Sequence, residues 1–191
     1  MLMFREPIPV GWACRMLARL PGVLVDHAHL ERKAATTAIT LERYRDLYGR
    51  VRELNAIAIE ELQHFERVLG LLEHRGIPFG QPVRSAWISG LMGAVRVGNN
   101  REQVIDHLLC CALIEGRSCE KFQLLGRALA GVDDELASFY ASLVESEGNH
   151  YATYLLMARH LDEGETDRRL NWFLDFEAGL MRQRHDLAIL H

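Results

Sequence analysis

Proline is confined to the first 82 positions of this 191-residue chain. Because proline interrupts helices, its absence from 22–77 and from 83–191 leaves room for long ones. In both stretches β-branched residues are sparse, Ala, Leu, Glu and Arg dominate, and no strand-like alternation of polar and apolar residues persists. The sequence therefore predicts an all-α protein.

Stop and cap signals divide these stretches into separate helices. Glycine and proline at 76–82 end one helix, and Gly131 ends another just before Asp133 and Asp134, which can cap the next. The predicted helices cover residues 23–48, 51–75, 101–130, 135–160 and 167–189, with a short helix at 87–95 inside the connection 83–100. Two helical hairpins joined by one long connection are the ferritin-like form of a four-helix bundle, here with an additional C-terminal helix. A chain of this length fits one domain, 1–191.

Composition indicates where in the cell the protein works and in which state its cysteines are. No apolar run reaches the roughly 18–20 residues of a membrane span, and Arg5, Glu6 and two prolines interrupt the N-terminal stretch where a signal peptide needs an apolar run. We therefore expect a cytoplasmic protein. The four cysteines have no C-x-x-C spacing and are expected to be buried, reduced thiols. The net charge of −4 decides nothing about partners, because four ionised glutamates at a metal site would account for it.

Four glutamates lie on apolar helix faces, where carboxylates do not belong. Most of the residues at i±3, i±4 and i±7 of each are apolar; the four are Glu31, Glu61, Glu115 and Glu147. Burying one ionised carboxylate without compensation is prohibitive. Burying four in one core therefore requires cations.

Two of these glutamates carry a histidine three residues later, His64 after Glu61 and His150 after Glu147. An i, i+3 pair lies on one helix face, so both side chains can reach the same metal ion. One E-x-x-H pair carries little information, but the order is specific: Glu, then E-x-x-H, then Glu again and E-x-x-H again. This order predicts a two-metal site with the ligands Glu31, Glu61, His64, Glu115, Glu147 and His150. Carboxylate and imidazole ligands without thiolates favour iron, with manganese second.

Other polar residues near the ligands have more modest interpretations. The segment 26–29 contains a second spacing of this kind, Asp26 to His29, for which we expect structural or supporting roles. Glu60 and Ser146 each precede a ligand glutamate and are candidates to accept the second N–H of a ligand histidine. The cluster of Tyr140, Tyr151 and Tyr154 is expected to be core rather than a radical site.

Four segments resemble a known family, the bacterial tRNA 2-methylthio-N6-isopentenyladenosine hydroxylases. They are 25–38 (VDHAHLERKAATTA), 60–65 (EELQHF), 109–120 (LCCALIEGRSCE) and 146–151 (SEGNHY), so the resemblance spans all four bundle helices. Gly148 and Asn149 are less typical of that family. The six predicted metal ligands match the family's ligand positions one by one.

The resemblance implies an activity that spacing cannot show. The family's two-iron centre activates dioxygen and hydroxylates the isopentenyl group of the modified adenosine next to the anticodon, with electrons from an external reductase. No flavin or nicotinamide motif is present in this chain. For the tRNA partner we expect contacts from Arg84, Arg96 and Arg101, which flank the long connection. The alternatives are iron oxidation or storage, a two-metal oxygenase or oxidase for a small molecule, and a non-catalytic helical module.

Overall fold

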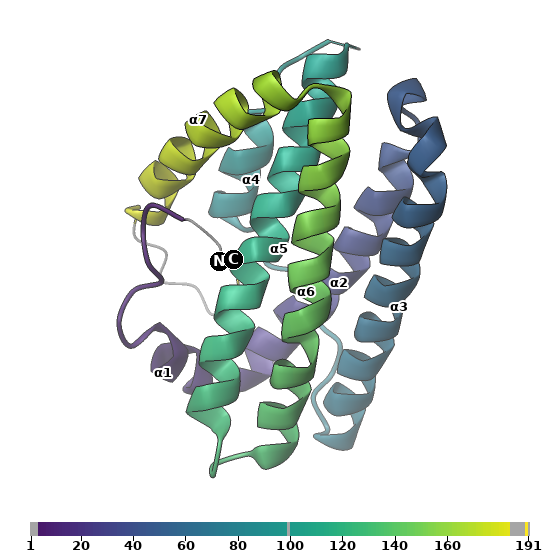
Figure 1. Cartoon of the computed structure of the whole chain (residues 1–191). Coiled ribbons are helices and arrows are strands. Elements are labelled where there is room, and N and C mark those ends of the chain that lie inside the picture. Colours follow the sequence, from purple (N-terminus) through teal and green to yellow (C-terminus); the bar gives the residue numbers. More distant parts are fainter. Residues whose placement is uncertain (1–3, 99, 184–189, 191) are drawn as a thin grey trace. The chain divides into compact units, whose positions relative to one another are not determined.

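The computed structural model describes residues 4–98, 100–183 and 190. Within these ranges the protein is helical and has no strand, as predicted. The helices are α1 (Trp12–Leu17), α2 (Leu20–Leu41), α3 (Val51–His74), α4 (Ala86–Gly93), α5 (Arg101–Leu129), α6 (Asp134–Leu161) and α7 (Glu163–Met181), with a 3-10 helix η1 (Arg45–Arg50) (Figure 1). None of them is long and apolar enough to cross a membrane. They form two compact units: the first hairpin unit holds residues 18–84 and Leu190, and the second hairpin unit holds residues 4–17 and 85–183.

The first hairpin unit is built on the packing of α2 against α3. The predicted helix 23–48 ends earlier than expected, at Leu41, and the chain continues as η1. Leu41, Tyr44 and Leu47 are all buried, and their spacing of three matches the repeat of a 3-10 helix rather than an α-helix. Burial of this apolar row therefore explains the change of helix type.

The end of α3 agrees with the prediction to one residue. Gly76 has a φ of +65°, a conformation that favours glycine, and its N–H bonds to the carbonyl of Glu73. The next N–H, from Ile77, reaches back to the carbonyl of Leu72 over 2.9 Å. These two bonds satisfy carbonyls that the helix end would otherwise leave open.

The second hairpin unit is built on α5 and α6, which lie side by side (Figure 1). The boundary between them follows the predicted signals, Gly131 and Asp133. Asn100 caps α5 by accepting a bond from the N–H of Gln103, and Asp133 caps α6 in the same way from Leu136. Gly131, with a φ of +75°, makes the turn between them. The short helix α4 begins one residue before its predicted start, because the Ser85 hydroxyl caps it.

The C-terminal helix differs from its prediction at its start. The last helix was expected to start at residue 167, but α7 begins at Glu163 because Asp162 accepts a bond from the N–H of Glu165. Acidic residues in the first turn, Glu163 and Glu165, also suit the positive end of the helix dipole. The helix ends at Met181, and most of the remaining predicted stretch lies outside the described residues.

A buried ion pair ties α7 to α5. The guanidinium of Arg117 donates two bonds, of 2.8 and 2.9 Å, to the carboxylate of Glu177, and both side chains are completely buried. Trp87 of α4 donates a third bond to Glu177, and Arg117 also donates to the carbonyl of Glu6. One turn further along α5, the ammonium of Lys121 is buried between the rings of Trp87 and Trp12, at 5.4 and 5.8 Å from their centres. This polar cluster fixes α4, α7 and the N-terminal segment to the helix that carries Glu115.

Candidate metal centre

The first hairpin unit brings three of the predicted ligands together. Glu31 comes from α2, and Glu61 and His64 come from successive turns of α3. All three are buried, and each offers a ligand atom within 4.8 Å of the other two. The Nδ1 atom of His64 lies 3.5 Å from a carboxylate oxygen of Glu31. The unit thus has a compact donor group of two carboxylates and one imidazole.

Glu31 is kept ionised by its neighbours. Burial alone would raise the pKa of its carboxyl, but contact with His27, with smaller contributions from His64 and Glu61, lowers this pKa well below the usual range. His27 lies one turn before Glu31 and hydrogen-bonds it through Nε2. Its imidazole is completely buried, and its hydrogen bond holds the carboxylate of Glu31 in place. This is the supporting role that the sequence led us to expect for the segment.

The other polar residues of the segment 26–29 have different partners. His29 bonds the carbonyl of Gly80 through Nε2 at 2.8 Å, and its ring stacks on Phe79 with the centroids 4.4 Å apart. Asp26 accepts a bond of 2.7 Å from the N–H of Leu190. Both residues therefore fasten chain segments within the first hairpin unit, which is the structural role expected of them.

The second hairpin unit repeats the donor group. Glu115 comes from α5, and Glu147 and His150 come from successive turns of α6. These three are also buried, and their ligand atoms again lie within 4.8 Å of one another. The Cys111 thiol lies one helical turn before Glu115. Burial, and to a smaller extent the negative charge of Glu115, raises the pKa of this thiol. Cys111 therefore stays a neutral thiol beside the carboxylates.

The remaining cysteines and tyrosines agree with their modest interpretations in most respects. The four cysteines are free thiols, and all but Cys14 are buried. Tyr140 and Tyr154 are buried core residues. Tyr151 is different, since it is half-buried and lines a cavity.

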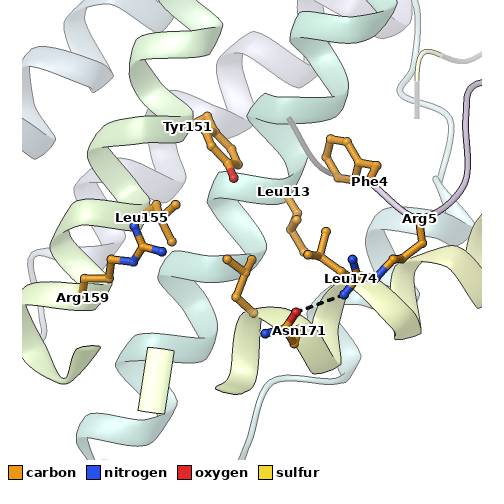
Figure 2. Close-up of a pocket in the computed structure, with 9 residues that line it drawn as sticks. Phe4, Arg5, Leu113, Tyr151, Leu155, Arg159, Asn171 and Leu174 are labelled. Atoms are coloured by element: carbon orange, nitrogen blue, oxygen red, sulfur yellow. Dashed lines mark hydrogen bonds between the residues drawn. The ribbon is translucent and has the colours of Figure 1, made fainter. Parts of the chain in front are cut away.

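That cavity was not predicted from the sequence. It has a volume of about 250 Å³ and lies in the second hairpin unit. Figure 2 shows its lining, which comprises Phe4, Arg5, Leu113, Tyr151, Leu155, Arg159, Leu170, Asn171 and Leu174. Its walls come from the N-terminal segment and from α5, α6 and α7. Only the position of Tyr151, one turn after Glu147, could have pointed to it from the sequence.

The predicted supporting residues Glu60 and Ser146 stay predictions. Glu60 lies exposed on α3. The Ser146 hydroxyl donates a bond of 2.9 Å to the carbonyl of Leu143 in its own helix.

The three arginines predicted to contact RNA have different surroundings. Arg84 and Arg101 are exposed. Arg96 is engaged in an ion-pair network, in which it donates to the buried carboxylate of Asp106 at 2.8 Å and also to Glu102 and Glu165. Burial would raise the pKa of Asp106, but bonds from Arg169 and Arg96 lower it. A structural role therefore accounts for Arg96, and an RNA contact by these arginines stays a prediction.

Two buried groups of two glutamates and one histidine, each on a helical hairpin, define a protein of the ferritin-like class. The model of the tRNA-(MS2IO6A)-hydroxylase (MiaE) family matches residues 3–191, and the chain belongs to this family. It is 37% identical over 164 residues to the tRNA 2-(methylsulfanyl)-N(6)-isopentenyladenosine(37) hydroxylase of Pseudomonas putida, a match that covers 85% of this chain and 78% of the relative. The hydroxylase of the same name from Salmonella typhimurium is 38% identical over 122 residues, covering 64% of this chain and 44% of the relative.

A solved structure is similar over the whole chain. It is a Synechococcus protein with aldehyde deformylating oxygenase activity, with a TM-score of 0.91 and 28% identity, and the match covers 100% of this chain and 96% of the other. The predicted ferritin-like class is confirmed by this likeness, and the predicted family by the matches above. The single-domain organisation stays a prediction.

Proposed function

We propose that this protein is a two-iron, dioxygen-dependent hydroxylase of the isopentenyl group on 2-methylthio-N6-isopentenyladenosine in tRNA, next to the anticodon. The observation that carries the proposal is the pair of buried Glu, Glu, His groups in a chain of this family. Both curated relatives named above are hydroxylases of this nucleoside. The enzyme would work in the cytoplasm, where its tRNA substrate is found.

The two donor groups together would hold the metal. Glu31, Glu61 and His64 would come from one hairpin and Glu115, Glu147 and His150 from the other. Four ionised carboxylates carry four negative charges, and two ferrous ions would neutralise them. Hard oxygen and imidazole donors without thiolates fit iron first and manganese second.

Bound iron would supply the activation of dioxygen that attack on an unactivated C–H bond needs, a step that no side chain can perform. Other residues of the chain hold and orient the side chains that would bind the metal. His27 positions the carboxylate of Glu31 by its hydrogen bond. The Arg117–Glu177 pair anchors α5 two residues beyond Glu115. The electrons would come from a separate reductase, and the modified base would leave the anticodon-loop stack to reach the buried centre.

Nucleoside analysis of tRNA tests the function. In a strain that makes the 2-methylthio-N6-isopentenyl nucleoside, deletion of this gene should abolish its hydroxylated form and leave the unhydroxylated precursor. The wild-type gene should restore hydroxylation, and a Glu115→Ala gene should not. Persistence of the hydroxylated nucleoside in the deletion strain would show that another protein performs this reaction.

A small-molecule oxygenase is the second candidate, because the similar Synechococcus structure has aldehyde deformylating oxygenase activity. Purified iron-loaded protein, given a reductant and dioxygen, separates the two. Turnover of a fatty aldehyde without turnover of the modified tRNA would favour the second candidate. A cage-sized assembly in solution would instead point to iron storage.

Metal removal should lower stability. Without cations, the buried carboxylates of each donor group repel one another. Bound metal removes this repulsion, and because it binds the folded state in preference to the unfolded chain, it adds to the stability of the fold. We expect verified removal of iron to lower the melting temperature by several degrees, measured by scanning calorimetry. Re-addition of ferrous ion under anaerobic conditions should restore it. An unchanged melting curve would contradict this expectation, because it would mean that these carboxylates are far less buried in solution than they are in the structure.

A further inference from the structure

The solvent face of α2, with the turn after it, carries concentrated positive charge. Arg32, Lys33, Arg43 and Arg45 are all exposed. The acidic residues of α2 itself, Asp26 and Glu31, are buried, and the single acid between positions 32 and 45 is the half-buried Glu42. This segment is therefore strongly basic in a chain whose net charge is −4.

None of these four cations forms an ion pair with a carboxylate of the described residues. Lys33 and Arg45 make no hydrogen bond there either. The described partners of Arg32 are an imidazole and a phenyl ring, since it donates to Nδ1 of His29 at 3.1 Å and lies over the ring of Phe79. Arg43 donates to the hydroxyl of Tyr44 at 2.9 Å.

Many arginines of the second hairpin unit differ in this respect. Those with described carboxylate partners are Arg5, Arg96, Arg117, Arg159, Arg168, Arg169 and Arg182. Their charge is largely neutralised where it stands. The unpaired charge on α2 is available to an anionic partner.

The exposed residues of α2 also share one helix face. At 100° per residue, Arg32, Thr36, Thr40 and Lys33 fall within an arc of about 100°, and Arg43 continues this line in the next turn. With Arg45 added, we call these six residues the α2 stripe. At 1.5 Å per residue, the part of the stripe on α2, from Arg32 to Thr40, is about 12 Å long, enough to follow consecutive phosphates of one strand. Lysine, arginine and threonine side chains are the groups that contact phosphates in nucleic-acid complexes.

An aromatic ring lies beside the stripe. Phe79 is 41% exposed, and one side of its ring stacks on the buried His29. The guanidinium of Arg32 is 5.7 Å from the ring centre. Unpaired bases of RNA loops stack on aromatic rings and on the planes of arginine side chains. Binding of an acidic protein surface would need the cations but not the exposed ring. The pairing of ring and cations therefore favours RNA over an acidic protein as the partner.

We propose that the α2 stripe binds the sugar–phosphate backbone of the tRNA anticodon arm, with Phe79 as a stacking platform for an unpaired base. This inference rests on the proposed function, since it names the surface that holds that substrate. The first residue of the stripe, Arg32, directly follows Glu31 in the sequence. RNA bound along the stripe would therefore contact the residue next to one of the proposed metal ligands. Arg32 and Lys33 are exposed, whereas Glu31 is buried.

Charge reversal tests the stripe. Lys33→Glu/Arg45→Glu removes two cations that have no described partner, so the protein should fold and bind metal as before. We expect its Kd for tRNA carrying the modified adenosine to rise at least about tenfold at moderate salt, and the slope of log affinity against log salt to fall by about one to two. The control Arg15→Glu/Arg127→Glu makes the same charge change at exposed positions outside the stripe and should change Kd less than about threefold. Fluorescence anisotropy with labelled tRNA measures both, after metal content and melting temperature have been matched.

Further variants separate the possible outcomes. The neutral pair Lys33→Gln/Arg45→Gln should give an intermediate loss, and Phe79→Ala should weaken binding without changing the salt slope. Wild-type affinity in the reversed double variant at two salt concentrations would overturn the inference. Unchanged tRNA affinity with slower reduction by the electron donor would assign the stripe to an acidic protein and overturn it too. If the wild-type protein binds tRNA through the stripe but does not hydroxylate it, the surface stands and the proposed function fails.

Discussion

Replacing Glu115 with alanine should reduce bound iron from about two ions per chain to fewer than about one. The carboxylate is buried and lies within 4.8 Å of donor atoms of Glu147 and His150. Its loss removes both a ligand and a negative charge that would balance the metal. His64→Ala should have the same effect through the donor group of the first hairpin unit.

A matched control exists on α6. Glu145 and Glu147 are two residues apart, but Glu145 is exposed and Glu147 is 2% exposed. Metal analysis should therefore show near-normal iron in Glu145→Ala and strongly reduced iron in Glu147→Ala. Equal iron content in the two variants, or full iron content in Glu115→Ala, would refute the assignment of these ligands.

Removing one member of the buried Arg117–Glu177 pair should be strongly destabilising. Glu177→Leu leaves the guanidinium of Arg117 buried without its main counter-charge and takes the hydrogen-bond acceptor from Trp87. We expect a loss of about 3–5 kcal/mol in the free energy of unfolding. For a chain of this size that corresponds to a decrease of roughly 6–20 °C in Tm. Urea unfolding of metal-loaded protein measures it.

The double variant Arg117→Leu/Glu177→Leu separates pairing from packing. Because neither charge is then left alone, the double variant should recover a large part of the loss seen in the single variant. Breaking the exposed Arg168–Glu165 pair with Arg168→Ala should cost less than about 1 kcal/mol. A Glu177→Leu effect as small as that of Arg168→Ala would show that the buried pair is unimportant for stability.

The donor groups were predictable because their signal is local and repeated. Each histidine follows its glutamate by one helical turn, and each glutamate interrupts an apolar face, so the pattern can be read without knowledge of the fold. Helix ends marked by Gly76, Gly131 and Asp133 were predictable for the same reason. In each case the residue acts on backbone within a few positions of itself.

Features that depend on distant segments were not predictable. The change to η1 depends on burial of Leu41, Tyr44 and Leu47, and an apolar row alone does not say which helix type will bury it. The role of Arg96 depends on Asp106 and Glu165, of which the second is 69 residues away. The cavity beside Tyr151 exists because the N-terminal segment meets α7, a contact between opposite ends of the chain.

The scarcity of lysine has a practical consequence. The chain has only two, and Lys121 is enclosed by the indole rings of Trp12 and Trp87. Lys33 is therefore the single exposed lysine. Amine-selective acylation of the folded protein should modify one side chain besides the terminal amino group. A fluorophore, a spin label or a cross-linker can thus be attached on α2, next to Arg32, without introducing any substitution.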